Sequence, residues 1–452
     1  MWAVRLLLGL AVAFSLSGGP SWADDAALPR IGWVSAVAGA VQYHSGGGQW
    51  SDALVNEPIA AGAGLRSAPD AVAELRLAGG RIALAGGGEL QILRFDADVL
   101  EIAVPAGRVG IHLDAVGPAK TVEIDLPSGA AWLAASGDYD IAAGDAQTGD
   151  GRAPPRVEIF AGKAQLGDGL EEGQLAASSP DPFSDWWRSQ GDDGAPSTHR
   201  LAPDIAGAAA LDANGRWEND PQFGAAWFPS DIAADWAPYR TGVWRFLPPW
   251  GWTWIDDAAW GFAPSHYGRW ARIGDRWGWV PDPQTAPADY SPAAIALLGT
   301  AGIGLSRPGD NGAAVVWFPL APGEAVGDGN EPDYRNRRFA SAVPRAVFVG
   351  GQPVAAALLD LPEQRLLDAP VILGSLDIPP AGPPAVAAAR KPVLVVVAAA
   401  PPRVPPRKPE TRVALLARPH PAPSTSPPHS AHNRQHLAAA RGAATGSWRV
   451  AR

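Results

Sequence analysis

Alternating apolar and polar positions dominate residues 31–176. Residues 72–77 (VAELRL) and 81–84 (RIAL) alternate in this way on either side of a glycine turn, which is typical of a β-hairpin. Short segments with the same alternation follow at residues 90–95, 99–104, 109–113, 122–126 and 157–160. Strands at this spacing, with no helical pattern between them, predict an all-β sandwich, roll or short solenoid.

A second pattern, dense in tryptophan, begins at Trp217. Between Trp217 and Trp279 lie 11 of the 20 tryptophans of the chain, and residues 217–281 contain only six valine, isoleucine or leucine residues. An aromatic-Ala-Pro unit, a short turn and a Gly-x-Trp unit occupy residues 236–244 and recur at residues 262–270. This repeat predicts stacked β-hairpins that bury their aromatic faces against one another.

The indoles of this block have two competing interpretations. Because aliphatic side chains are few, we expect most of the tryptophans to form the core. An exposed platform that stacks sugar rings, or a protein interface, is the functional alternative. Trp250, Trp252 and Trp254 alternate along a predicted strand and should share one face. The ligand-binding candidates are the aromatic residues Trp250, Trp252, Trp254, Trp260, Tyr267 and Trp270.

Polar residues with catalytic potential are few in the block. Asp256 and Asp257 could serve glycoside chemistry, but neighbours in a strand point to opposite faces, so a turn is favoured. His266 beside Tyr267 could act as a base, but a structural role is favoured because no second histidine is near. We predict no catalytic residue, cofactor or metal site. Three arginines are expected over indole faces: Arg245, Arg269 and Arg276.

The amino terminus is typical of a secretory signal peptide, residues 1–23. Arg5 precedes an apolar run at residues 6–16, and Ser21-Trp22-Ala23 forms a small-x-small cleavage site. The run is about half as long as a membrane span, so we expect cleavage and no transmembrane helix afterwards. The chain has no cysteine, which excludes disulfides, thiolate ligands and a lipid anchor on cysteine. We therefore expect an exported bacterial protein, periplasmic or at the cell surface.

Charge divides the chain into an acidic body and a basic tail. Residues 381–452 carry 11 Lys or Arg against one acid, while the whole chain has a net charge of −10. With Arg5 set aside, residues 24–380 therefore carry −21. The Pro, Ala and Arg composition predicts a disordered tail at residues 380–452. Such a tail would dock on an anionic envelope polymer, lipid headgroups or an acidic protein; nucleic acid is not expected.

The strand-rich segment contains a set of glycine and aliphatic motifs. They lie at residues 32–41 (GWVSAVAGAV), 49–50, 61–67, 73–77, 137–141, 157–162 and 173–174. Together they make residues 31–176 resemble a FecR-type domain, which implies an extracytoplasmic β-module. FecR itself is a membrane-spanning anti-sigma regulator. We expect no counterpart of its cytoplasmic helical segment or of its membrane helix in this chain, so only the β-module is expected to carry over.

A denser set of motifs follows. It lies at residues 211–217, 227–229, 236–239, 242–244, 250–254, 260–264, 266–270 and 277–281. Residues 201–281 thereby resemble an exported, Trp-rich bacterial domain of unassigned function that is often found behind FecR-like domains. Residues 285–378 resemble the extension that commonly follows it. Asp181-Pro182 predicts the capped start of a short helix in a connector at residues 180–200.

The sequence thus favours a non-enzymatic envelope protein that acts in binding, scaffolding or sensing. Its Trp-rich module would take a glycan or a protein. One alternative is a glycan-binding or glycan-active protein that uses exposed tryptophans. Another is a FecR-like accessory regulator of envelope signalling.

Overall fold

The computed structural model describes most of the chain between residues 30 and 378. The described residues are 30–46, 49–77, 79–114, 120–144, 154–167, 175–177, 180–190, 201, 205–282, 290–299, 314–325, 334–372 and 378. The predicted signal peptide, residues 191–200 of the connector and the predicted tail lie outside them. Strands predominate in what is described, and the prediction of an all-β protein is confirmed.

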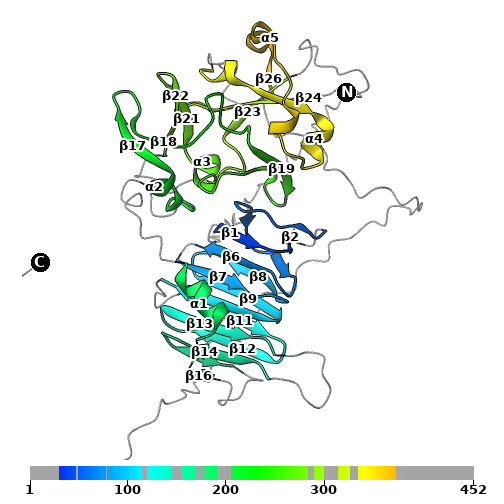
Figure 1. Cartoon of the computed structure of the whole chain (residues 1–452), viewed down its shortest axis with the longest axis vertical. Helices are drawn as coiled ribbons and strands as arrows, with labels where there is room; N and C mark the ends of the chain where they lie inside the picture. Colours follow the sequence, from blue (N-terminus) through cyan, green and yellow to red (C-terminus); the bar gives the residue numbers. More distant parts are fainter. Residues whose placement is uncertain are drawn as a thin grey trace, which may run out of the picture. The chain divides into compact units, whose positions relative to one another are not determined.

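The described residues between 32 and 177 include sixteen strands, which form two sheets of eight strands each. One sheet has the order β16 (Leu175–Ala177), β14 (Arg156–Ile159), β13 (Gly137–Ala142), β10 (Arg108–Leu113), β7 (Gly80–Leu84), β6 (Val72–Leu77), β1 (Gly32–Ala38), β4 (Pro58–Ile59). The other has the order β15 (Ala164–Leu166), β12 (Gly129–Leu133), β11 (Thr121–Leu126), β9 (Val99–Ala106), β8 (Glu89–Phe95), β5 (Ala63–Ser67), β2 (Val41–Ser45), β3 (Ser51–Asp52). Along both sheets the strand order follows the chain almost without inversion, so the strands succeed one another as a stack (Figure 1). We call this part the β-stack.

The core of the β-stack is built by the period-2 alternation seen in the sequence. In β9 every second side chain is buried, and β11, which pairs with it in parallel, has the same pattern. The predicted hairpin is present as β6 and β7, with Leu75 opposite Ile82. Both of these side chains are buried in one apolar cluster that spans the stack.

The predicted helix of the connector is present as α1 (Pro182–Ser189). Asp181 caps it, because its carboxylate accepts from the Ser184 backbone N–H at 2.8 Å while the Ser184 hydroxyl accepts from the Asp181 backbone N–H at 2.8 Å. Trp187 is fully buried and lies on Gly110 of β10, where a Cβ would stand 2.4 Å from the indole. Glycine at this position therefore lets α1 dock on the β-stack.

Antiparallel hairpins make up most of the Trp-rich part, as the repeat predicts. They are β17 (Gly215–Asp220) with β18 (Gly224–Pro229), β19 (Gly242–Leu247) with β20 (Gly251–Asp256), β21 (Arg269–Ile273) with β22 (Arg276–Val280), and β23 (Ile295–Leu298) with β24 (Ala314–Pro319). The strands β25 (Ser341–Pro344) and β26 (Val371–Ile372) extend the sheet of β23 and β24. The helical elements are α2 (Ala210–Asn214), α3 (Phe262–His266), η3 (Arg337–Phe339), α4 (Arg345–Val349), η4 (Ala355–Ala357) and α5 (Glu363–Asp368).

The two copies of the internal repeat contact each other at equivalent positions. The Tyr239 hydroxyl of the first copy donates to the Ser265 carbonyl of the second at 2.9 Å. The second turn ends at Gly268, whose φ of 59° and close approach to the Val280 carbonyl both require glycine. Each copy then leads into a strand, β19 or β21.

A buried polar contact joins the turn at residues 54–57 to the hairpin of β19 and β20. The Asn56 amide donates to the carbonyls of Asp256 at 2.9 Å and Ala258 at 2.7 Å. Glu57, which is 0 % exposed, pairs with Arg245 at 2.7 Å. Val243, Leu247 and Ile255 of the hairpin belong to the same apolar cluster as the β-stack core. None of the described helices is both long and apolar enough to span a membrane.

Candidate functional site

The structure places most tryptophans of the block in the core. Seven of the eleven are buried: Trp227, Trp244, Trp254, Trp260, Trp270, Trp277 and Trp279. They pack edge to face in a continuous cluster, for example Trp244 against Trp254 with ring centroids 5.4 Å apart. The expectation that indoles replace the missing aliphatic core is confirmed.

Four of the six predicted ligand-binding residues are therefore inaccessible as a platform. Trp254, Trp260, Tyr267 and Trp270 are all buried. Trp260 and Trp270 are brought together by Trp236, whose ring lies 5.7 Å from the first and 5.4 Å from the second. The remaining two candidates are partly exposed.

These two, Trp250 and Trp252, lie in different environments, so the predicted stripe of three indoles is wrong. Trp250 precedes β20 and packs against Tyr290 at 5.3 Å and against the β-stack core. Trp252 packs against Phe348 at 4.5 Å, and its indole N–H donates to the Ile378 carbonyl. The strand begins only at Gly251, whose φ is 81°, so the alternation does not reach back to Trp250.

The indole N–H groups of four buried tryptophans hold irregular backbone in place. They donate to carbonyls as follows: Trp227 to Leu211 at 2.9 Å, Trp270 to Pro264 at 2.9 Å, Trp279 to Tyr267 at 2.8 Å, and Trp317 to Tyr239 at 3.1 Å. A buried carbonyl without a donor would be costly, so each bond ties a turn or short helix to the core. The tryptophan cluster therefore has a structural role.

The predicted polar candidates also have structural roles. Asp256 is buried, and its carboxylate accepts from the Trp254 indole N–H at 3.0 Å and from the Ala258 backbone N–H at 2.9 Å. This arrangement begins the turn after β20, whereas the neighbouring Asp257 is exposed. His266 is buried, stacks on Tyr290 at 4.9 Å and has Nδ1 2.9 Å from the Ser291 carbonyl. The described residues contain no cluster of three His, Cys, Asp or Glu suited to a metal ion.

Burial shifts the pKa values of these two groups in opposite directions and predicts opposing effects of pH on stability. It raises the pKa of Asp256 to about 6 and lowers that of His266 to about 4. Between pH 4 and 6 folded Asp256 holds a proton that the unfolded chain has lost, so its contribution to stability falls as pH rises. Folded His266 lacks a proton that the unfolded chain binds, so its contribution rises with pH. Each contribution is about 3 kcal/mol, and they largely cancel.

Urea unfolding of single variants between pH 4 and 6.5 should reveal the two opposing pH dependences of the free energy of unfolding. Relative to the native chain, Asp256→Asn should gain stability with rising pH, and His266→Gln should lose it. Parallel pH profiles for the native chain and both variants would contradict the two pKa shifts.

The arginines expected over indoles have other partners, so that expectation is wrong. Arg245 pairs with Glu57, and Arg269 donates to the Gly268 carbonyl at 2.7 Å. Arg276 forms a bidentate pair with Glu218 and lies over Phe228, not an indole, at 4.0 Å. Glu57 from a distant turn reaches Arg245, and Glu218 and Phe228 from other strands reach Arg276. The local sequence does not show these partners.

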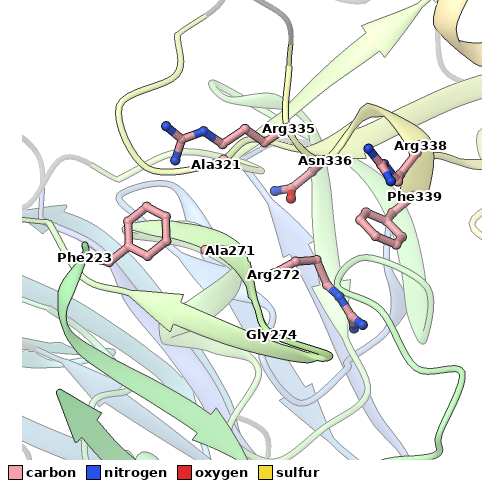
Figure 2. Close-up of a pocket in the computed structure, with 9 residues that line it drawn as sticks. All are labelled: Phe223, Ala271, Arg272, Gly274, Ala321, Arg335, Asn336, Arg338 and Phe339. Atoms are coloured by element: carbon pink, nitrogen blue, oxygen red, sulfur yellow. The ribbon is translucent and has the colours of Figure 1, made fainter. Parts of the chain in front are cut away.

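A pocket of about 320 Å³ lies elsewhere in the Trp-rich part, and the sequence interpretation missed it. Figure 2 shows the residues that line it: Phe223, Ala271, Arg272, Gly274, Ala321, Arg335, Asn336, Arg338 and Phe339. They come from the β17–β18 turn, from β21 and the turn after it, from the segment after β24, and from residues 335–339 around η3. Its volume is at the lower end of the range for small-molecule sites. The Arg-Asn-Arg-Arg run at residues 335–338 was the sequence feature that could have indicated this pocket.

Among the described lining residues of the pocket, the only charged groups are arginines. Arg272, Arg335 and Arg338 form no ion pair with any residue that the structure describes. Two of them lie over aromatic rings. Arg272 lies 5.3 Å from the Phe339 ring centroid, and Arg335 lies 5.7 Å from that of Phe223. The lining residues that the structure describes include no carboxylate to neutralise this charge.

Buried polar contacts fix the segment that carries two of these arginines. Asn336 is 1 % exposed, and its amide donates to the carbonyls of Trp270 at 2.7 Å and Pro319 at 3.1 Å. The nearby Glu324 accepts from the backbone N–H groups of Ala321 and Arg335, at 2.7 and 2.9 Å. This carboxylate is thus engaged with backbone and holds the pocket wall.

The described fold and site define a Trp-rich β-hairpin domain with a cationic pocket. Residues 208–324 match a family of unknown function, DUF6600, and this range includes the hairpins from β17 to β24. The pocket combines residues inside the matched range with residues 335–339 beyond it. No curated protein matches the chain, and no solved structure matches it.

Proposed function

We propose that the protein is a non-enzymatic binding protein whose Trp-rich domain holds an anionic ligand in the arginine-lined pocket. The observation that carries the proposal is the lack of described ion-pair partners for Arg272, Arg335 and Arg338. In the same chain Arg245 and Arg276 are each paired with a carboxylate. Unpaired guanidinium groups at a concave site are suited to bind carboxylate or phosphate.

The lining also favours binding over catalysis. Apart from the arginines and Asn336, its members are phenylalanine, alanine and glycine. Arginine stays protonated, and neither an amide nor a phenyl ring exchanges protons near neutral pH. The described lining residues therefore offer charge and shape, but no general acid or base.

The proposed setting is the envelope of a bacterium. The signal-like amino terminus and the resemblance of residues 31–176 to a FecR-type domain support an exported protein. In this proposal the basic residues 381–452 add a second, non-specific attachment to anionic envelope polymer, lipid headgroups or an acidic protein. The pocket then gives specificity that a simple basic tail lacks.

The test is calorimetric titration of the full chain with citrate, glucose 1,6-bisphosphate and dextran sulfate. We expect Arg338→Ala to weaken binding of at least one probe about tenfold, because one charge-assisted contact is lost. The matched control is Arg345→Ala, an exposed arginine outside the pocket, which should bind as the native chain does.

The variant that replaces Arg272, Arg335 and Arg338 together keeps the basic tail, so any binding that it retains measures the tail. If the native chain and this triple variant bind all three probes equally, the proposed function is wrong.

A further inference from the structure

The guanidinium groups of Arg272 and Arg335 are anchored at different places in the pocket. Arg335 lies over Phe223, which comes from the β17–β18 turn, and Arg272 lies over Phe339 of η3. Arg272 is further held by Trp277, at 5.4 Å from the ring centroid. Figure 2 shows Phe223 and Phe339 on opposite sides of the pocket, with Asn336 between them.

This placement limits what can neutralise both charges at once. Each arginine would give up its contact with a phenyl ring if it moved to meet the other at one oxyanion. Asn336, which lies between the two arginines, is buried, and its amide is fixed by two hydrogen bonds to carbonyls. The floor of the pocket therefore does not bring the two guanidinium groups closer together. A ligand that contacts both arginines in their present positions has to carry negative charge at two ends.

We infer that the pocket recognises a compact dianion whose two acidic groups stand on opposite sides of a ring-sized body. One group meets Arg335 on the Phe223 side. The other meets Arg272 on the Phe339 side. This inference rests on the proposed function and deepens it by naming the ligand class.

The pocket volume sets the size of the body between the acids. About 320 Å³ holds one six-membered ring with its substituents, and the phenyl groups of Phe223 and Phe339 provide apolar walls for it. A doubly charged sugar fits this description, whether its acids are carboxylates or phosphates. The planar guanidinium fork accepts either oxyanion in a bidentate contact, so the shared chemistry is the pair of separated oxyanions.

The test compares rigid probes that differ only in the position or number of their acids. Terephthalate carries two carboxylates on opposite sides of a benzene ring, phthalate carries them on adjacent carbons, and benzoate carries one. We expect calorimetry on the full chain to give terephthalate an affinity at least tenfold higher than that of phthalate. Arg272→Ala and Arg335→Ala should each reduce the affinity for terephthalate to that for benzoate, while Arg345→Ala changes nothing.

Glucose 1,6-bisphosphate against glucose 6-phosphate repeats the comparison with phosphates. If the bisphosphate outranks terephthalate, the natural acids are phosphates; if terephthalate outranks it, they are carboxylates. The separated dianion is supported if the bisphosphate binds at least tenfold more tightly than glucose 6-phosphate, and equal affinities for these two sugars would contradict it. Equal affinities for terephthalate and phthalate, both lost in the arginine variants, would overturn the spacing and leave the proposed function standing. Binding of all probes that is insensitive to Arg272→Ala and Arg335→Ala would overturn both. Urea unfolding of each variant checks that the fold is intact.

Discussion

Replacing Trp254 with alanine is expected to lower the free energy of unfolding by about 3–5 kcal/mol. Trp254 is fully buried and packs against Trp244 at 5.4 Å and Tyr239 at 5.9 Å. Its indole N–H also donates to the buried Asp256 carboxylate, which would lose a donor in the variant. Urea unfolding followed by circular dichroism measures the change, because this signal does not depend on the number of tryptophans in the way that fluorescence does.

The matched control for this variant is Phe246→Ala in the same hairpin. Phe246 is an aromatic residue of β19, but it is 40 % exposed. Its removal should cost less than about 1 kcal/mol, since little buried surface is lost. Equal destabilisation by the two variants would contradict the assignment of the indole cluster as the core.

Replacing Arg245 with methionine is expected to cost about 3–5 kcal/mol of unfolding free energy at neutral pH. The variant leaves Glu57 fully buried without its positive partner. Burial already raises the pKa of Glu57, and loss of Arg245 should raise this pKa further. An acid with a raised pKa in the folded state loses stability as pH rises, so the variant should be least destabilised at acid pH.

A second substitution separates the charge effect from simple loss of packing. Glu57→Gln in the Arg245→Met background removes the unpaired charge and should restore most of the lost stability at neutral pH. Urea unfolding at pH 4 and 7 for the single and double variants measures this. A double variant as unstable as Arg245→Met alone would show that the charge of Glu57 is not the cause.

The strands of the β-stack could be predicted because one face of each is buried, so apolar residues recur at every second position. The predicted hairpin at residues 72–84 is present as β6 and β7 for this reason. The tryptophan core could be predicted from composition, because nothing else in residues 217–281 can fill an interior. In both cases the signal is local in the sequence.

Features that depend on contacts between distant segments could not be predicted from the sequence. The ion-pair partner of Arg245 is Glu57, which lies 188 residues away in the chain. No local sequence pattern indicates this pairing. Trp250 looked like a member of the strand, but the hairpin turn ends at Gly251. The pocket exists only because residues 335–339 lie beside the β21–β22 turn, which brings Arg272 and Arg338 to one cavity.

The order of strands in the β-stack has a consequence for how the chain folds. Each strand pairs with strands that are close in the chain, as in the run β6, β7, β10, β13 and β14. If the chain emerges gradually from its amino end, each new strand can therefore pair with the edge of a sheet that has already formed. Folding in this way needs little search between distant segments, and short unpaired edges are covered as they form. The β-stack is thus suited to assemble vectorially and to offer the finished surface on which β19 and β20 then dock.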